Sequence, residues 1–370
     1  MALEEIYVDH TGGSDSLGNG SVEFPYQTLS QAFSSHSNVG GSSDGMRFNV
    51  KNTTYASGMT SLGTLPTGTT IGKQLWIQSY SSTAGDSTDY VYLDADGSDD
   101  IWVNTSLDAV AFVRCYFYNT ATSGHGRFYD LDNQITCYES VFDGCRPQAD
   151  TTLGYFGCIF KNMTPNTSAG KLITGTSNRF ISCLISGSGS DDTIGIEGIC
   201  FQNCAFYWDG SLGGMCLLPA SGGQVVNNSF VYSSGTTHSS HNGIGCRMDD
   251  FGTCFGNYFE NCKTSIGKEN NADSPIILNN AHFNCTTHVT SNIETIYAPD
   301  TVTQHTMSAS GHPNAPSNWT PSTALYELRD NALPTAVSTP SNAPHYYGAF
   351  LSPNTGSGGG YVHRPQIRTL

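Results

Sequence analysis

The sequence predicts an all-β protein folded as a solenoid, the parallel β-helix. Three observations support this prediction: a recurring apolar phrase, turn-forming residues between the repeats, and cysteines that keep one phase of the repeat. In the phrase, a small or polar residue stands two positions before a large apolar anchor. The phrases are Cys115–Phe117, Ser140–Phe142, Cys158–Phe160, Cys183–Ile185, Cys204–Phe206, Asn228–Phe230, Asn257–Phe259 and, more loosely, Ala281–Phe283.

The spacing of the anchors indicates one solenoid coil per repeat. Successive anchors lie about 24 residues apart on average, a period typical of stacked supersecondary units. The intervals are rich in Gly, Ser, Thr, Asn and Asp, which excludes the uninterrupted helices of helical repeats. Segments such as 178–185 and 224–231 are short, β-branched or aromatic, and bounded by turn residues, as strands are. We therefore expect coils of three short strands.

The twelve cysteines are predicted to be buried thiols rather than disulfides. Stacked strands lie about 4.8 Å apart, whereas a disulfide prefers a Cβ separation of about 3.8 Å. A buried free cysteine behaves as a small apolar residue. No close Cys-x-x-Cys pair is followed by a second such pair, so no zinc site is expected.

Composition excludes two classes of partner. The net charge is -16, and only 15 Lys and Arg are scattered over 370 residues, so we expect no nucleic acid. No apolar run is long enough to cross a membrane. The acidic first residues do not resemble a secretory signal, and free thiols favour folding in a cytoplasm.

The N-terminal segment carries a family resemblance. Residues 6–20 followed by 24–33 resemble the opening motif of the pectate-lyase-like superfamily of right-handed parallel β-helices. The resemblance implies a first strand, a Gly- and Asp-rich loop, and a short helix that closes the end of the coil. Leu29, Ala32 and Phe33 fall at i, i+3 and i+4, which gives that helix one apolar face. Residues 324–334 and 347–350 are similar to the closing segment of this superfamily.

Three regions are expected. Residues 1–45 form the N-terminal cap, and residues 46–310 form the coils, with early rungs centred on Phe48, Ile77 and Leu93. Residues 311–370 form an extended, irregular tail, because its prolines cannot continue a strand ladder. The Gly-rich segment 356–360 precedes a short peptide that we expect to dock on a neighbouring subunit. The docking residues are Tyr361, Arg364, Ile367 and Arg368.

Catalytic residues do not form a convincing set. Glycoside hydrolysis needs two carboxyl groups within about 10 Å, and the phases of the candidate acids do not converge on one face of neighbouring coils. Gly124–Gly126 precedes Asp191 and Asp192, the reverse of the polygalacturonase order. For the enzyme alternative, a polysaccharide lyase or glycosidase, the residues to consider are Asp192, Asp249, Asp250 and Arg247. The sequence favours a role without catalysis.

The sequence supports two binding hypotheses, one for carbohydrate and one for calcium. Tyr116, Tyr118 and Tyr207 flank inward anchors, should point outward, and could stack on sugars. No cofactor is expected, although the loop from Asp9 to Asp15 could hold calcium.

The combined features favour a structural protein of a virus particle, a bacteriophage capsid decoration protein or tail spike. The resemblance implies a homotrimer. Its expected partners are other virion proteins and host surface polysaccharide, and its expected location is the virion, assembled in the host cytoplasm. A secreted adhesin that binds carbohydrate is a further alternative.

Overall fold

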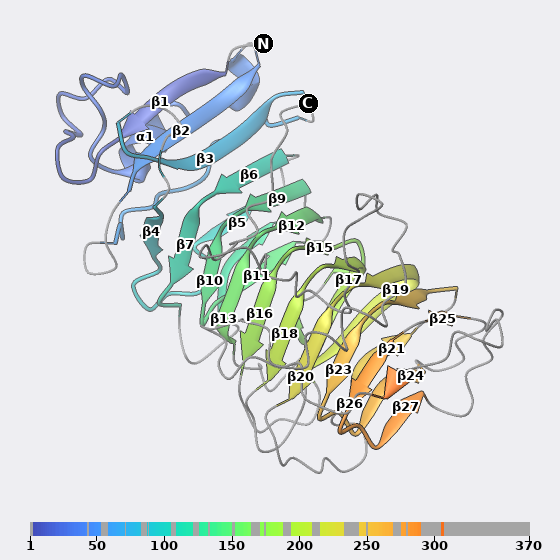
Figure 1. The fold of residues 1–370 in the computed structure, drawn as a ribbon. Helices are drawn as coiled ribbons and strands as arrows, with labels where there is room; N and C mark the ends of the chain where they lie inside the picture. The colour runs from blue at the N-terminus through green and yellow to red at the C-terminus, as the bar shows by residue number, and fades with distance from the viewer. Residues whose placement is uncertain are drawn as a thin grey trace, which may run out of the picture. The chain divides into compact units, whose positions relative to one another are not determined.

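The computed structural model divides into two compact units, residues 1–166 and 167–370. Both units consist of parallel strands stacked in ladders (Figure 1). The described residues are 3–42, 44–52, 58–70, 72–82, 87, 89–104, 109–120, 126–131, 134–149, 152–163, 171–173, 175–187, 194–208, 215–232, 244–248, 251–268, 275–278, 280–289 and 305–306. The predicted tail, 311–370, lies outside them, and the predicted boundaries at residues 45 and 310 stay predictions.

Residues 1–166 form three parallel ladders. The first contains, in spatial order, β1 (Glu4–Val8), β2 (Gly45–Lys51), β3 (Gln74–Tyr80), β6 (Ala109–Val113), β9 (Gln134–Tyr138) and β12 (Thr152–Phe156). The second contains β4 (Val91–Asp94), β7 (Cys115–Tyr118), β10 (Val141–Asp143) and β13 (Ile159–Met163). The third contains β5 (Trp102–Asn104), β8 (Arg127–Leu131) and β11 (Arg146–Ala149). The chain visits the three ladders in turn, as β6, β7 and β8 do, so each of these coils has the expected three strands.

Residues 167–370 repeat this arrangement with two longer strands, β17 (Ile194–Gln202) and β19 (Met215–Val226), that each serve two ladders. One ladder holds β15 (Arg179–Ile181), the end of β17, the end of β19, β22 (Thr253–Phe255) and β25 (Ile276–Leu278). The second holds β16 (Leu184–Gly187), β18 (Ala205–Trp208), β20 (Ser229–Tyr232), β23 (Tyr258–Glu260), β26 (Ala281–Phe283) and β28 (His305–Thr306). The third holds β14 (Lys171–Ile173), the starts of β17 and β19, β21 (Ile244–Met248), β24 (Thr264–Lys268) and β27 (Thr287–Val289). Parallel stacked sheets of this kind are consistent with the predicted β-solenoid.

The helix predicted near the N-terminus is present as α1 (Leu29–Ser35). The Thr28 hydroxyl caps it by accepting a hydrogen bond from a first-turn backbone N–H. Its predicted apolar face is buried, and the Phe33 ring packs edge-on against Phe48 of β2 with centroids 4.8 Å apart. A short 3₁₀ helix, η1 (Val39–Gly41), follows it.

Aromatic rings fill the interior of each unit. In residues 1–166 the Phe142 ring stacks on Phe117 and on Phe160, with centroids 4.9 Å apart in both cases. In residues 167–370 the Phe206 and Phe230 rings stack at 5.6 Å. The inward anchors predicted from the repeat therefore form columns of stacked rings within each unit.

Two details of the predicted repeat are wrong. Phe48 and Ile77 pair with each other and align with the first ladder, whereas Leu93 pairs with Phe117 of the second ladder, so the three are not equivalent anchors. In the last repeat, His282 rather than Phe283 pairs with Phe259 and points inward. A one-residue shift exchanges the two faces of a strand, and the loose last phrase hid that shift.

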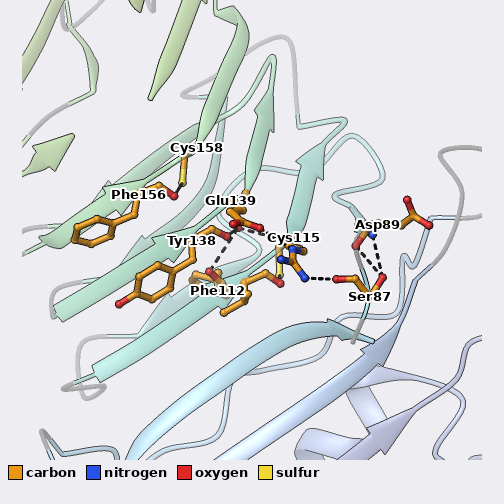
Figure 2. A network of polar contacts seen from close by, with 11 residues as sticks. Ser87, Asp89, Phe112, Cys115, Tyr138, Glu139, Phe156 and Cys158 are labelled. Atoms are coloured by element: carbon orange, nitrogen blue, oxygen red, sulfur yellow. Dashed lines mark hydrogen bonds and ion pairs between the residues drawn. The ribbon is translucent and has the colours of Figure 1, made fainter. Parts of the chain in front are cut away.

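The bend from the first ladder to the second is the same in successive coils of residues 1–166. A residue in the left-handed conformation begins it, Arg114 (φ 52°) in one coil and Glu139 (φ 47°) in the next. Arg114 Nε donates to Glu139 Oε2 at 2.7 Å, and another Arg114 N–H donates to the Ser87 carbonyl (Figure 2). Inside the bend, the Ser140 hydroxyl oxygen accepts from the Cys115 backbone N–H at 3.2 Å. Side chains thus connect neighbouring coils at these two bends.

Cysteines occupy inward positions at this bend and elsewhere in the coils. The side chains of eleven cysteines are described, all are free thiols, and nine are buried. The Cys158 thiol, for example, lies 3.4 Å from the Cys137 carbonyl of the preceding coil. Figure 2 shows its other contact, with the Phe156 carbonyl. The predicted thiols are therefore confirmed for the described residues.

Candidate functional site

The outward side of the second ladder in residues 1–166 carries an aromatic group, here called the tyrosine cluster: Tyr90, Tyr92, Tyr116 and Tyr118. Phe117 points into the interior, so its neighbours Tyr116 and Tyr118 point the other way. The Tyr92 and Tyr116 rings lie 4.5 Å apart, and Tyr118 contacts both rings edge-on. Val141 and Ile159 extend the same surface along the following strands.

A charged pair borders the tyrosine cluster. The Tyr116 hydroxyl donates to Asp143 Oδ2 at 2.5 Å, and Lys161 Nζ lies 3.2 Å from the same oxygen. The Lys161 ammonium also lies 5.1 Å from the centre of the Tyr116 ring, within the range of a cation–π contact. Burial, and then the negative charge of Glu139, raise the pKa of the Tyr90 phenol, which stays neutral at ordinary pH. The surface is thus mostly apolar and has one paired charge.

Residues 167–370 have a similar surface on their own second ladder, here called the outer apolar cluster: Val231, Tyr258 and Ala281, with Tyr207 and Phe283 packed against them. In the same strands Phe206, Phe230 and Phe259 pair with one another and point inward, which places their sequence neighbours Tyr207, Val231 and Tyr258 on the outward side. The Tyr258 hydroxyl donates to the Glu260 carboxylate, which is itself buried. Apolar residues form most of this surface; Val231, Tyr258 and Ala281 are buried, whereas Tyr207 and Phe283 are partly buried.

The three tyrosines predicted to bind carbohydrate lie on these two surfaces. Tyr116 and Tyr118 point outward as expected, but their side chains are buried, with 7% and 4% of the residue surface exposed. Tyr207 is partly exposed. Carbohydrate binding by these residues stays a prediction.

Arg247 is the one described residue of the predicted catalytic set. It lies in β21 between the buried residues Cys246 and Met248, so it points outward. Asp192, Asp249 and Asp250 lie outside the described residues, as do the predicted docking residues Tyr361, Arg364, Ile367 and Arg368. The catalytic alternative therefore stays a prediction.

The acidic loop predicted to accept calcium has carboxylates that bind donors of the chain. Asp9 Oδ1 accepts from the Thr11 and Gly12 backbone N–H groups at 3.0 and 2.9 Å, and Asp9 Oδ2 lies 2.7 Å from Lys51 Nζ. Burial raises the pKa of the Asp9 carboxyl, but Lys51 and the backbone donors outweigh it, and the pKa lies below its ordinary value. Asp15 accepts two backbone N–H groups and the Thr28 hydroxyl. Calcium binding here would compete with these contacts.

No family model, curated protein or solved structure matches this chain. Among the described residues, no three His, Cys, Asp or Glu side chains are grouped so as to hold a metal ion. In the same part of the chain, no helix has the length and apolar character to span a membrane.

Two groups of residues were not predicted from the sequence. Asp143 and Lys161 border the tyrosine cluster because their strands are adjacent, and no motif marks them. A second group lies in the last described coils, where His282 Nδ1 lies 2.8 Å from Ser265 Oγ and the His288 ring stacks on the His282 ring with centroids 4.3 Å apart. No motif marks these residues either.

Proposed function

We propose that this protein is a structural component of a virus particle, a capsid decoration protein or tail spike of a bacteriophage. The observation that carries the proposal is the apolar outward side of the second ladder in both units, where Tyr90, Tyr92, Ile159, Tyr207 and Phe283 are only partly buried. Exposed apolar side chains that are grouped on one side of a protein mark contacts with other proteins. We propose that these surfaces associate laterally in a homotrimer.

The buried free thiols support the same proposal. Disulfides dominate in oxidising compartments, whereas free buried cysteines suit a protein that folds in a cytoplasm, as virion proteins do. The coils carry side-chain bonds from one bend to the next, which suits a rigid surface component.

Proteomics of purified particles tests the assignment. We expect the protein at high copy number in particles from the host that produces it, and no reducing ends or unsaturated products when the purified protein meets a panel of acidic polysaccharides. Product release together with absence from particles would establish the alternative, a polysaccharide lyase or glycosidase. Binding to whole cells without cleavage would instead favour an adhesin.

A pair of variants tests the assembly surface. Tyr207 is a partly exposed member of the outer apolar cluster, and Gln224 is an exposed residue of β19. We expect sedimentation equilibrium to find a trimer of the native chain, a monomer for Tyr207→Glu and a trimer for the control Gln224→Glu. A native monomer, or a trimer that Tyr207→Glu leaves intact, would contradict the proposed surface.

A further inference from the structure

The column of inward rings in residues 167–370 continues into two stacked histidines, here called the histidine pair: His282 of β26 and His288 of β27. The His282 ring stacks on Phe259 with centroids 5.5 Å apart and planes 9° apart. The His288 ring stacks on His282 at 4.3 Å and 7°. His282 is buried and His288 is partly exposed. His282 thus takes the inward place that phenylalanine has in the earlier coils.

A buried hydroxyl contacts the buried imidazole. His282 Nδ1 lies 2.8 Å from Oγ of Ser265, a residue of β24 that is itself buried. A hydroxyl both donates and accepts, so it can partner a neutral imidazole in either tautomer. It carries no charge, however, and does not balance the positive charge of a protonated ring.

Three charged residues lie on segments next to the histidine pair. Glu260 of β23 follows the inward Phe259, so it points outward, where it accepts from the Tyr258 hydroxyl. Arg247 of β21 points outward as well. Lys263 precedes β24 and is partly exposed, and its positive charge disfavours further positive charge nearby. Neither Glu260 nor Arg247 therefore faces the pair.

Protonation of the histidine pair is unfavourable in the folded chain. Two imidazolium rings at this distance would repel each other, and a buried cation loses its hydration. Burial, and then the charge of His282, lower the pKa of His288, whereas Cys285 acts in the opposite direction. In the unfolded chain, histidines ionise near the ordinary value of about 6.5. The unfolded chain therefore binds more protons, and the stability that the neutral pair contributes above about pH 6.5 is lost as the pH falls.

We propose that the histidine pair is an acid-sensitive switch, at which protonation separates the two stacked rings and opens the coils that contain β26 and β27. Two backbone bonds of these coils report on the opening. The Ala281 N–H donates to the Asn257 carbonyl and the Thr287 N–H to the Lys263 carbonyl, both at 2.8 Å. Opening breaks these bonds and exposes the two N–H groups to exchange with solvent.

Hydrogen exchange of the native, full-length chain at pH 7.5 and pH 5.5, followed by mass spectrometry, tests the proposal. Rates are corrected for the intrinsic exchange rate at each pH. Each histidine that must stay neutral in the folded coil raises the opening constant by up to about tenfold between these pH values. We expect peptides that cover residues 280–289 to lose at least about tenfold in protection. Peptides that cover residues 134–149, where the sequence has no histidine, should lose less than about threefold. Unchanged protection of residues 280–289, or equal losses in the two segments, would overturn the proposal.

A pair of variants tests whether the histidine pair itself senses the acid. His288→Phe keeps an aromatic ring for stacking but removes one ionisable group, so we expect the acid-induced loss of protection at residues 280–289 to shrink at least about threefold. The control His36→Phe makes the same change at a partly exposed histidine of residues 1–166 and should leave that loss as in the native chain. Circular dichroism verifies that each variant is folded. A native-like loss in His288→Phe would contradict the switch, and the comparison of the two native segments decides the matter if that variant does not fold.

Discussion

The side-chain carbonyl of Asn257 accepts two hydrogen bonds from Asn228 of the preceding coil, one from its backbone N–H at 2.8 Å and one from Nδ2 at 3.0 Å. Asn257 in turn donates to Asn280 of the next coil at 2.9 Å and to the Val225 carbonyl at 2.8 Å. All three asparagines are buried at the bend that leads into the second ladder. Each amide therefore satisfies backbone groups that the strands leave without a partner at the bend.

Replacing Asn257 by Ala should destabilise the fold. The change leaves the Asn228 backbone N–H and the Val225 carbonyl buried without this partner, and a buried unsatisfied group costs about 1–3 kcal/mol. We expect a loss of about 3 kcal/mol in the free energy of unfolding, measured by urea denaturation. The control Gln224→Ala, at an exposed position of β19, should change it by less than about 0.5 kcal/mol. Equal effects of the two variants would refute the role given to the amide ladder.

Phe142 should contribute strongly to the interior of residues 1–166. Its ring is wholly buried between Phe117 and Phe160, so Phe142→Ala removes two stacking contacts and leaves a cavity. We expect a loss of about 3–5 kcal/mol in unfolding free energy. The control is Phe24→Ala, because Phe24 is 56% exposed and should tolerate truncation within about 0.5 kcal/mol. A Phe142→Ala loss below about 1 kcal/mol would mean that the ring column does not hold in solution.

Ser182 lies between β15 and β16 and adopts the left-handed conformation, so substitutions at this position test that conformation. Its φ of 55° is strained for residues that have a Cβ, and most strained for β-branched ones. We expect Ser182→Val to lower the thermal unfolding midpoint, at a cost of about 1–2 kcal/mol. Ser182→Gly, made at the same position, should leave stability equal or slightly higher, because the loss of strain offsets the greater freedom of the unfolded chain. If Val is tolerated as well as Gly, the bend does not have this conformation.

Asp9 should make stability depend on acid pH. Folding lowers the pKa of its carboxyl, so the unfolded chain binds a proton more readily as the pH falls. The stability contributed by the charged carboxylate is present above about pH 4 and is lost as the pH falls through the folded pKa. We expect Asp9→Asn to cost about 1 kcal/mol at pH 6, and its difference from the native chain to vanish at lower pH.

Urea titrations at pH 6 and pH 3 would measure this difference. Glu23→Gln, which removes one negative charge at an exposed position, is the control and should show no such convergence. A difference between Asp9→Asn and the native chain that grows on acidification would reverse the sign expected from the Lys51 contact.

Much of the fold could be predicted from local patterns. Turn residues at regular intervals exclude helices, and alternation places Phe142 and Phe206 inside and Tyr116 and Tyr207 outside. The α1 helix was predicted because Leu29, Ala32 and Phe33 recur with helical spacing. The inward position of His282 was not predicted, because inward positions were identified by their apolar side chains and histidine is polar.

The candidate sites were harder to predict, since each depends on strands that are distant in sequence. Asp143 meets Tyr116 only because β10 pairs with β7, and that register is invisible in composition. His282 Nδ1 likewise lies 2.8 Å from Ser265 Oγ, although the two residues are 17 positions apart in the sequence.

By itself, the sequence determined that this chain forms stacked parallel strands. The turn residues exclude helices, and strands stacked at the spacing of the anchors bury the apolar side chains. Tertiary structure alone decided which side chains meet. A repeat specifies which face a residue occupies, whereas contact between coils depends on register, and register is set by the sum of many pairings along a ladder rather than by any one segment.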